Sequence, residues 1–382
     1  MSDSRKLIAE ALLEIVEQAQ SGGPVVRVGL MAHGSELGDD ELLRGAMIAQ
    51  ERNPGLKVVA IGPKQDCWAG LEWIDTPACE ADIAAALEKA LADGVIGGAV
   101  ALHYPFPVGV TTIGRIVTPG KGKPMFIAST TGTSSPHRNE AMLRNAVYGN
   151  AVAKAMGIVE PSVAVLNIDG AGPVLRALGK LKDAGYGVSF GASERKDGGS
   201  LLRGNDIVAG GVDVLVCDTL TGNVLIKVFS TFTTGGYYES TGFGYGPSVG
   251  EGWGKVVSII SRSSGAPVIA DALAYTARAV KGGLPKVMAA ELAAAKAAGF
   301  DKLCEDLRPK AVCDDTPVKP PVVPVDAEIA GVDVLDMERA AQALWKEGIY
   351  AETAMGCTGP VVRIQTAVKD KAAAILHAAG FI

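Results

Sequence analysis

At 382 residues the chain is long enough for a large hydrophobic core and for more than one compact unit, because single domains mostly contain about 100–200 residues. Its 48% hydrophobic and 5% aromatic residues, together with 48 glycines, are typical of a closely packed α/β protein and exclude a disordered or fibrous chain. The net charge of −6 and the pI near 5.4 leave no broad basic surface, so we expect no nucleic-acid partner.

The N-terminal segment, residues 4–20, has the spacing of an amphipathic helix. Ile8, Leu12 and Ile15 fall on one face, and we expect residues 1–24 to form a helix that precedes the main domain. Glutamates stand where a signal peptide would be apolar, and no apolar run reaches the roughly 18 residues of a membrane span. We therefore expect a cytoplasmic protein that does not bind membranes.

Strands and helices then alternate along the chain. We predict strands at Val25–Met31, Lys57–Ile61, Gly97–Leu102, Pro124–Ala128, Ser162–Ile168 and Val212–Cys217, and helices at Asp39–Arg52, Glu80–Ala92, Asn139–Met156 and Pro173–Ala184. Continuous apolar strands that alternate with helices are typical of a parallel sheet covered on both faces. The expected fold class is therefore α/β, a three-layer αβα arrangement with a mostly parallel sheet over residues 25–306.

The loops that follow these strands are the place to search for a site, because open α/β sheets bind ligands at the carboxyl ends of their strands. Four loops are rich in groups that bind an anion through hydrogen bonds: AHGSELGDD (32–40), HYPFPVGVTT (103–112), STTGTSSPHRN (129–139) and CDTLTGN (217–223). The sequence therefore predicts an anion site at this edge of the sheet.

The hydroxyl-rich loop supplies the first group of candidates for binding phosphate or an acyl group: Ser129, Thr130, Thr131, Gly132, Thr133, Ser134 and Arg138. The loop is either a simple connection into the next helix or an anion site, because hydroxyls and amides at a helix N-terminus bind anions readily. Arg138 could hold a phosphate in a bidentate contact.

The segment after the last predicted strand supplies the second group: Asp218, Thr219 and Gly222 for binding, and Asn223 and Lys227 for catalysis. Asn223 and Lys227 are four residues apart and so share one helix face. Lys227 is either an exposed helical lysine or a cation that neutralises phosphate while Asn223 donates a hydrogen bond to an acyl oxygen. His33 and His103 each follow a strand directly, where a general acid or base could stand, and His33 is a binding candidate.

Two segments lack the periodicity of regular elements. Ser230–Gly254 is glycine-rich and too long for a passive connection, so we expect a mobile lid. Its glycines do not form a dinucleotide-binding turn, and we expect no cofactor. Leu307–Pro324 is proline-rich and predicts a semi-rigid linker. The remaining residues, 325–382, predict a small α/β module with helix Met337–Glu347, strand Tyr350–Met355, turn Gly356–Gly359, strand Val361–Ile364 and helix Val368–Ala379.

Six cysteines are scattered without disulfide or zinc spacing, so we expect neither a disulfide framework nor a metal site. Cys217 ends a buried strand and is expected to pack in the core. Cys357 is either a small buried hydrophobe or a nucleophile on a turn. The turn residues Gly356, Thr358 and Gly359 favour the nucleophile, because backbone amides in a turn stabilise a thiolate or a developing oxyanion.

Three stretches resemble a known family: RVGLMAHGSELGDDELLRGAMIAQERNPGLKVVAIG, GIVEPSVAVLNI and GGVDVLVCDTLTGNVLIK. They are similar to the phosphate acyltransferase of bacterial phospholipid synthesis, over roughly residues 25–298. This resemblance implies an αβα fold related to isocitrate dehydrogenase and phosphotransacetylase, and reversible acyl transfer between a thioester and inorganic phosphate. Where that family has DAMGGD, GNTGA and GAN loops, this chain has LMAHGSELGDD, HYPFPVGVTT and TTGTSS, so the acyl donor does not carry over with the fold.

The C-terminal module, which contains AETAMGCTGPVVRI, resembles the alpha subunit of component C of the glycine/sarcosine/betaine reductase complex, and that resemblance covers essentially the whole chain. It implies that Cys357 carries an acetyl group as a thioester and that phosphate, a substrate, releases it as acetyl phosphate. The implied partners are a thiolase-like beta subunit and a selenoprotein component A. We also expect an oligomer.

Two other functions stay open at this point. One is a free-standing phosphotransacylase that uses coenzyme A or carrier-protein thioesters, in which Cys357 has no role. The other is a non-catalytic scaffold subunit that docks a partner.

Overall fold

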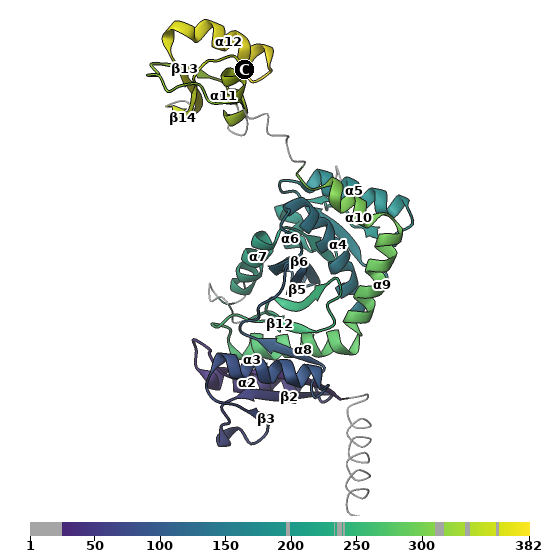
Figure 1. Cartoon of the computed structure of the whole chain (residues 1–382). Coiled ribbons are helices and arrows are strands. Elements are labelled where there is room, and N and C mark those ends of the chain that lie inside the picture. The colour runs from purple at the N-terminus through teal and green to yellow at the C-terminus, as the bar shows by residue number, and fades with distance from the viewer. Residues whose placement is uncertain are drawn as a thin grey trace, which may run out of the picture. The chain divides into compact units, whose positions relative to one another are not determined.

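The computed structural model describes residues 25–195, 199–232, 234, 239, 241–309, 317–332, 337–356 and 359–382 (Figure 1). The helix predicted within residues 1–24 lies outside the described residues. The chain divides into two compact units, Met1–Arg308 and Pro309–Ile382. The division falls just inside the segment predicted as a linker.

The described part of the first unit contains a 12-stranded sheet with the order β3-β2-β1-β4-β12-β11-β5-β6-β10-β7-β8, and β9 also pairs with β7. The strands are β1 (Val26–Met31), β2 (Leu56–Gly62), β3 (Glu72–Asp75), β4 (Gly98–Ala101), β5 (Val110–Val117), β6 (Pro124–Thr133), β7 (Ser162–Leu166), β8 (Ser189–Phe190), β9 (Leu201–Leu202), β10 (Val214–Val216), β11 (Gly246–Gly250) and β12 (Val257–Ile259). The pairs β11–β12, β11–β5 and β5–β6 are antiparallel, and the other pairs are parallel. The predicted fold class, α/β with a mostly parallel sheet, is confirmed.

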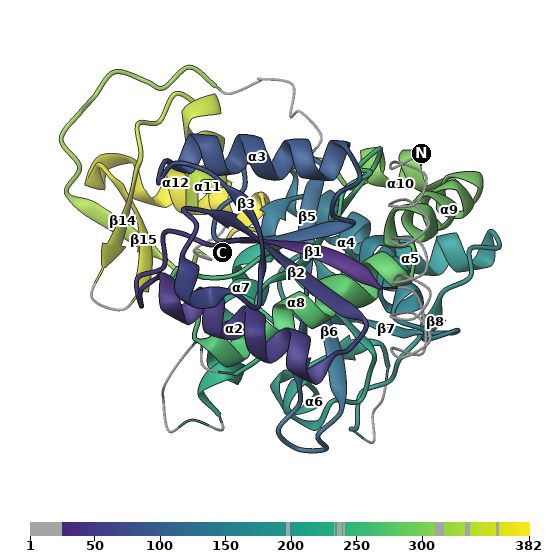
Figure 2. The ribbon, with the colours of Figure 1, turned by 90° about the horizontal axis from the view of Figure 1, so that it is seen from below.

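Helices cover both faces of the sheet. They are α2 (Asp39–Arg52), α3 (Glu80–Ala92), α4 (Arg138–Ala155), α5 (Ala171–Asp183), α6 (Gly204–Ala209), α7 (Thr219–Thr231), α8 (Ala266–Lys281), α9 (Leu284–Ala297) and α10 (Phe300–Asp306). In Figure 2, β1 and β2 lie between α3 on one side and α2 with α8 on the other. Strand β4 is buried along its whole length, as expected for a strand covered on both faces.

Strand β6 is held between α4 and α7. A Cβ added at Gly149 of α4 would contact Ala128, and one added at Gly222 of α7 would contact Ile127, its neighbour on β6. Because successive side chains of a strand point to opposite faces, the two helices pack on opposite faces of β6. At Gly222 the added Cβ would lie 1.8 Å from the Ser129 carbonyl oxygen, so only glycine permits this approach of α7.

Three predictions about loops are wrong. Strand β6 does not end at Ala128 but runs to Thr133, so the first part of the hydroxyl-rich loop, residues 129–133, is strand. It pairs with β5, which contains the end of the predicted 103–112 loop, through Val110 opposite Thr133 and Thr111 opposite Gly132. Threonine is β-branched and suits a strand, which explains the extension. The glycine-rich segment contains β11, a fully buried strand, and the lid prediction otherwise falls partly outside the described residues.

Further elements of the first unit were not predicted. They include helices α8, α9 and α10, which follow β12. None of the helices in the described ranges has the length and apolar character needed to cross a bilayer.

The second unit contains β13 (Ala327–Ala330), α11 (Met337–Lys346), β14 (Glu352–Gly356), β15 (Gly359–Ile364) and α12 (Lys369–Ala378). Its three-stranded antiparallel sheet has the order β13-β15-β14 and buries Ile329, Leu344, Val362 and Leu376 in a small core. The predicted helices and hairpin strands of this module are confirmed, and β13 is an addition. Gly356 pairs with Gly359 at the end of the hairpin, whereas Cys357 and Thr358 lie outside the described residues.

Candidate functional site

The two predicted groups of residues meet where the carboxyl end of β10 lies beside the middle of β6. The Ser129 hydroxyl lies 2.7 Å from the Thr219 hydroxyl, and the Asn223 side-chain amide donates a 3.1 Å hydrogen bond to the Thr130 carbonyl. Asn145 of α4, which the sequence analysis missed, donates to the Cys217 carbonyl at 3.3 Å. These contacts tie the start of α7 to the middle of β6 and fix the shape of the predicted site.

The hydroxyls of β6 divide into buried and accessible groups. Thr130 is fully buried, and its hydroxyl donates to the Tyr245 carbonyl at 2.6 Å. Thr131 is half-buried and Thr133 is exposed. Gly132 has φ +75°, and an added Cβ would lie 2.5 Å from the Val110 carbonyl oxygen, so this glycine allows β5 and β6 to pair. At this end of the strand Thr133 is accessible to a ligand, and Thr131 is partly accessible, although its hydroxyl also lies 2.9 Å from the Thr112 hydroxyl.

Arg138, the first residue of α4, is paired with two carboxylates. Its guanidinium lies 3.1 Å from Asp218 and 3.6 Å from Asp169, whose side chain is 99% exposed. Asp218 also caps α7 by accepting hydrogen bonds from the Thr221 amide at 3.0 Å and hydroxyl at 2.7 Å. Burial would raise the pKa of Asp218, but the hydrogen bonds from Thr221 and Arg138 outweigh burial and lower that pKa.

Lys227 faces a buried carboxylate. Its ammonium donates to Glu239 at 3.0 Å, and Glu239, which is 3% exposed, also accepts from the Tyr245 hydroxyl at 3.2 Å and the Ser264 hydroxyl at 2.9 Å. Burial would lower the pKa of Lys227, but the hydrogen bonds to Tyr245 and Glu239 outweigh burial and raise that pKa. Lys227, for which the sequence left open an exposed helical lysine or a cation that neutralises phosphate, is therefore paired with a buried carboxylate. Glu239 was missed because it lies in the glycine-rich segment, which has no periodicity.

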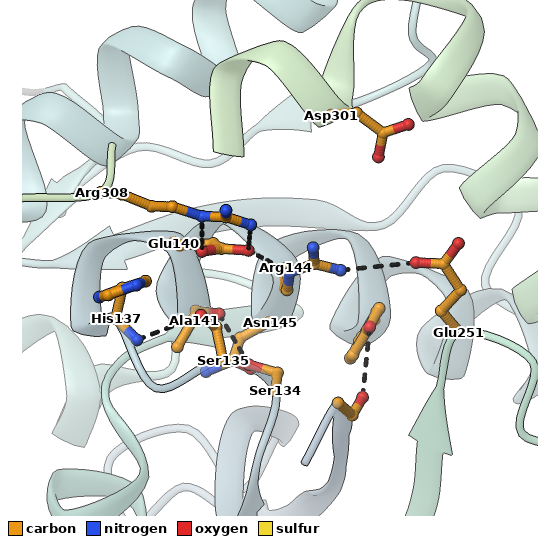
Figure 3. A network of polar contacts seen from close by, with 12 residues as sticks. Ser134, Ser135, His137, Glu140, Ala141, Arg144, Asn145, Glu251, Asp301 and Arg308 are labelled. Atoms are coloured by element: carbon orange, nitrogen blue, oxygen red, sulfur yellow. Dashed lines mark hydrogen bonds and ion pairs between the residues drawn. The ribbon is translucent and has the colours of Figure 1, made fainter. Parts of the chain in front are cut away.

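A second polar network lies at the N-terminus of α4 (Figure 3). Arg308 contacts Glu140 with two hydrogen bonds, at 2.7 and 3.2 Å, and Arg144 contacts the same carboxylate at 2.9 Å. Burial would raise the pKa of Glu140, but these arginines outweigh it and lower the pKa to about 2. Ser134, a predicted binding residue, is buried and donates to Asn145 at 2.7 Å. It lines a cavity of about 450 Å³ that also contains Ser135, His137 and both arginines.

His33 lies apart from these groups. Its Nδ1 is 2.6 Å from the Asp39 carboxylate, and the ring lines a cavity of about 220 Å³ with Glu80 and Arg262. Arg262 follows β12, and its signal in the sequence is the SRSS run after an apolar strand, in a region left without predicted elements. His103 lines a different, apolar cavity beside Tyr104.

The cysteines in the described residues fall into two classes. Cys67 and Cys79 are exposed, whereas Cys217 and Cys304 are buried. Burial raises the pKa of the Cys217 thiol strongly and that of Cys304 to about 12, so neither forms a thiolate near neutral pH. The predicted core position of Cys217 is confirmed. In the part of the chain that the structure describes, no cluster of three or more histidine, cysteine or acidic side chains is placed to hold a metal ion.

Comparison with known proteins gives two kinds of sequence relative. A family model described as "Fatty acid synthesis protein" matches residues 26–363. The alpha subunit of component C of the glycine/sarcosine/betaine reductase complex of Peptoclostridium acidaminophilum is 46% identical over 387 residues, which cover 100% of both chains. The phosphate acyltransferase of Thermotoga petrophila is 28% identical over 236 residues, which cover 53% of this chain and 67% of the relative.

Among solved structures, that of a branched-chain phosphotransacylase from Enterococcus faecalis covers 67% of this chain and 100% of its own. Its sequence identity to this chain is 17%, and its TM-score is 0.47.

Proposed function

The chain belongs to the fatty acid synthesis protein family and to the family of the component C alpha subunit, and from this membership we propose that it is the acyltransferase subunit of an amino-acid reductase complex. It converts an enzyme-bound acetyl thioester and inorganic phosphate to acetyl phosphate. The observation that carries the proposal is the 46% identity to a component C alpha subunit over the full length of both chains, because that likeness includes the second unit.

Cys357 is the proposed carrier of the acetyl group. A phosphate oxygen forms a bond to the acyl carbon, the carbon–sulfur bond breaks, and the thiolate leaves with the electron pair. A thiolate is both a good nucleophile and a good leaving group, so the same residue can be loaded and discharged. Cys357 stands in the sequence between the last residue of β14, Gly356, and the first of β15, Gly359. The loading partners in this proposal are a thiolase-like beta subunit and the selenoprotein component.

Phosphate is proposed to bind at the carboxyl ends of β6 and β10. We infer different roles for the residues there from their burial. The accessible groups Thr131, Thr133 and Arg138 contact the anion, whereas the fully buried Ser129 and Thr130 hold the site in shape. The remaining members support this arrangement: Asp218 and Thr219 cap and begin α7, Gly222 allows its approach, and Asn223 and Lys227 lie on its next turns. Hydrogen bonds that already exist before the reaction need no reorganisation during it.

The proposal is tested by arsenate-dependent breakdown of acetyl phosphate in the full chain together with its partner subunits. We expect Cys357→Ser to abolish this activity, because a serine alkoxide is far harder to form near neutral pH than a thiolate. Cys79→Ser is the matched control, since Cys79 is an exposed cysteine of the first unit, and it should keep the wild-type rate. Full activity in the Cys357→Ser variant would overturn the carrier role.

A second candidate function is a free-standing phosphotransacylase, which is favoured by the likeness to the Thermotoga petrophila phosphate acyltransferase. The same variants separate the two functions. In a free-standing enzyme, the isolated wild-type chain and its Cys357→Ser variant would both form acetyl phosphate from acetyl-coenzyme A. A chain that shows neither activity, alone or with its partners, would be a scaffold.

A further inference from the structure

A cavity of about 420 Å³ lies at the end of the β5–β6 pair that is farther from the residues proposed to bind phosphate. Arg115 of β5, which lines this cavity, is opposite Phe126 of β6, whereas Thr131 and Thr133 stand at the other end of β6. The rest of the wall comes from the segment after β5, the last turns of α7, residues 239 and 241–244, and the first turns of α8. The proposed function assigns no ligand to this cavity.

Most polar side chains of the cavity wall already have a partner within the protein. The hydroxyls of Thr118, Ser230 and Thr241 each donate to a backbone carbonyl, at 3.1, 2.8 and 3.1 Å. Glu239 is paired with Lys227 at 3.0 Å. Apart from these residues and two further charged ones, the wall consists of apolar side chains and glycines.

The two remaining charged residues, Arg115 and Asp271, are half-buried and have opposite charges. Within the described residues neither side chain forms a hydrogen bond or an ion pair, and the Arg115 Nε is buried without a partner. The Arg115 guanidinium lies 4.6 Å from the centre of the Phe243 ring, a contact with the ring face that leaves N–H groups available to a carboxylate. Burial lowers the pKa of Arg115 and raises that of Asp271, and the attraction between the two charges does not offset burial in either case.

A ligand that brings both missing partners fits this pair of charges. Half-buried charges without partners cost free energy, and a ligand with a single charge would leave one of them unpaired. A carboxylate suits the guanidinium of Arg115, which can bind it in a bidentate contact, and an ammonium group suits the carboxylate of Asp271. An α-amino acid has both groups on one carbon atom.

The apolar part of the wall indicates what the rest of the ligand is. Phe229, Phe232 and Phe243 line the cavity together with Ile226 and Val268. The volume lies within the range of small-molecule sites, in which apolar walls bury the body of the ligand and a few polar groups orient it. A large apolar side chain on the amino acid would fill this space, whereas glycine would leave it empty.

We propose that this cavity binds an α-amino acid with a large apolar side chain, whose carboxylate contacts Arg115 and whose ammonium group contacts Asp271. The proposal is independent of the proposed function, because neither of these residues has a part in it.

Isothermal titration calorimetry of the full wild-type chain with L-leucine and L-phenylalanine tests the site. We expect at least one of the two to bind with one site per chain. Three analogues of leucine each lack one recognised group: N-acetyl-L-leucine has no ammonium group, L-leucinamide has no carboxylate, and glycine has no apolar side chain. Each should bind at least about 10-fold more weakly than the better amino acid, because charged hydrogen bonds and apolar burial each contribute at least this much.

Asp271→Asn should weaken the binding of leucine or phenylalanine at least about 10-fold and leave that of N-acetyl-L-leucine unchanged, because the acetylated amine makes no ion pair with Asp271. Loss of this preference separates a direct contact from a general change of fold. Asp66→Asn is the matched control: the Asp66 side chain is 99% exposed and lies outside the cavity wall, so its variant should bind like the wild type.

The proposal is overturned if neither leucine nor phenylalanine binds the wild type at concentrations up to about 10 mM. It is also overturned if N-acetyl-L-leucine and L-leucinamide bind as tightly as leucine, or if Asp271→Asn keeps the wild-type preference for the free amino group. Because the analogue series uses the wild-type chain, it decides the question even if a variant fails to fold.

Discussion

Replacing Gly222 with alanine tests the packing of α7 on β6, on which the proposed site depends. In an open helix, Gly→Ala is stabilising by up to about 1 kcal/mol because alanine has the higher helix propensity. At Gly222 the new Cβ would lie 1.8 Å from the Ser129 carbonyl oxygen, a backbone atom that cannot rotate away. Overpacking of this kind costs about 1–3 kcal/mol, and the short contact places Gly222 at the upper end. We therefore expect a net loss of about 2 kcal/mol.

Gly179 in α5 provides the matched control, because nothing lies within 4 Å of its added Cβ. Gly179→Ala should be stabilising by about 0.5–1 kcal/mol. The two variants should then differ by about 3 kcal/mol, or roughly 6–10 °C in the thermal midpoint of a domain of this size. Differential scanning calorimetry and denaturant titration measure the difference. If Gly222→Ala were as stable as Gly179→Ala, the close approach of α7 to β6 would be incorrect.

Two further predictions concern the ionic networks. Arg308→Ala should lower the thermal midpoint at pH 7. The pKa of Glu140 is about 2 in the folded chain and 4.5 ordinarily, so its stabilising effect is complete above 4.5 and is lost as the pH falls towards 2. The difference in thermal midpoint between wild type and variant should therefore shrink over this pH range. A difference that stays constant down to pH 2.5 would contradict the ion pair between Arg308 and Glu140. Lys227→Met should cost about 1–2 kcal/mol by urea unfolding, less than a fully buried pair because the lysine is 39% exposed. The double variant Lys227→Met/Glu239→Gln should lose less free energy of unfolding than the two single variants lose together. Additive losses would show that the two side chains are not coupled.

The regular part of the fold was predictable because local signals and packing agree. Helix α2 has the predicted bounds, Asp39–Arg52, with three acidic residues in its first turn and an arginine in its last, which suit the helix dipole. Strand β11 was not predictable. Its residues are glycine, proline, serine and valine, and it is buried because β5 approaches closely: a Cβ at Gly246 would lie 1.8 Å from the Ile113 carbonyl oxygen. A strand made of small residues that allow another backbone to approach closely lacks the alternation of hydrophobic and polar residues from which a strand is predicted.

At the candidate site, too, the sequence predicted individual residues but not the contacts between distant segments. The sequence identified Arg138 and Lys227 as candidate cations for phosphate, and in the structure they stand at the start of α4 and within α7. It did not predict their pairing with carboxylates: Asp218 was expected to bind the ligand, not Arg138, which is 80 residues away along the chain, and Glu239 is in a segment without periodicity. Spacing reports which residues share a helix face, whereas charge pairing depends on which loops meet across the sheet.

These partners bear on which cation could take up phosphate at the proposed site. Glu239 is 3% exposed and accepts hydrogen bonds from Lys227, Tyr245 and Ser264, so moving it away from Lys227 would break a buried network. Arg138 is different, because the carboxylate of Asp169 is almost fully exposed and lies 3.6 Å away, at the edge of an ion-pair contact. Exposed ion pairs contribute little, so an incoming phosphate could replace Asp169 at small cost. A guanidinium also binds phosphate in a bidentate geometry that an ammonium cannot provide. Within the proposed function, Arg138 is therefore the residue that contacts the anion, and Lys227 contributes by holding α7 against the buried carboxylate.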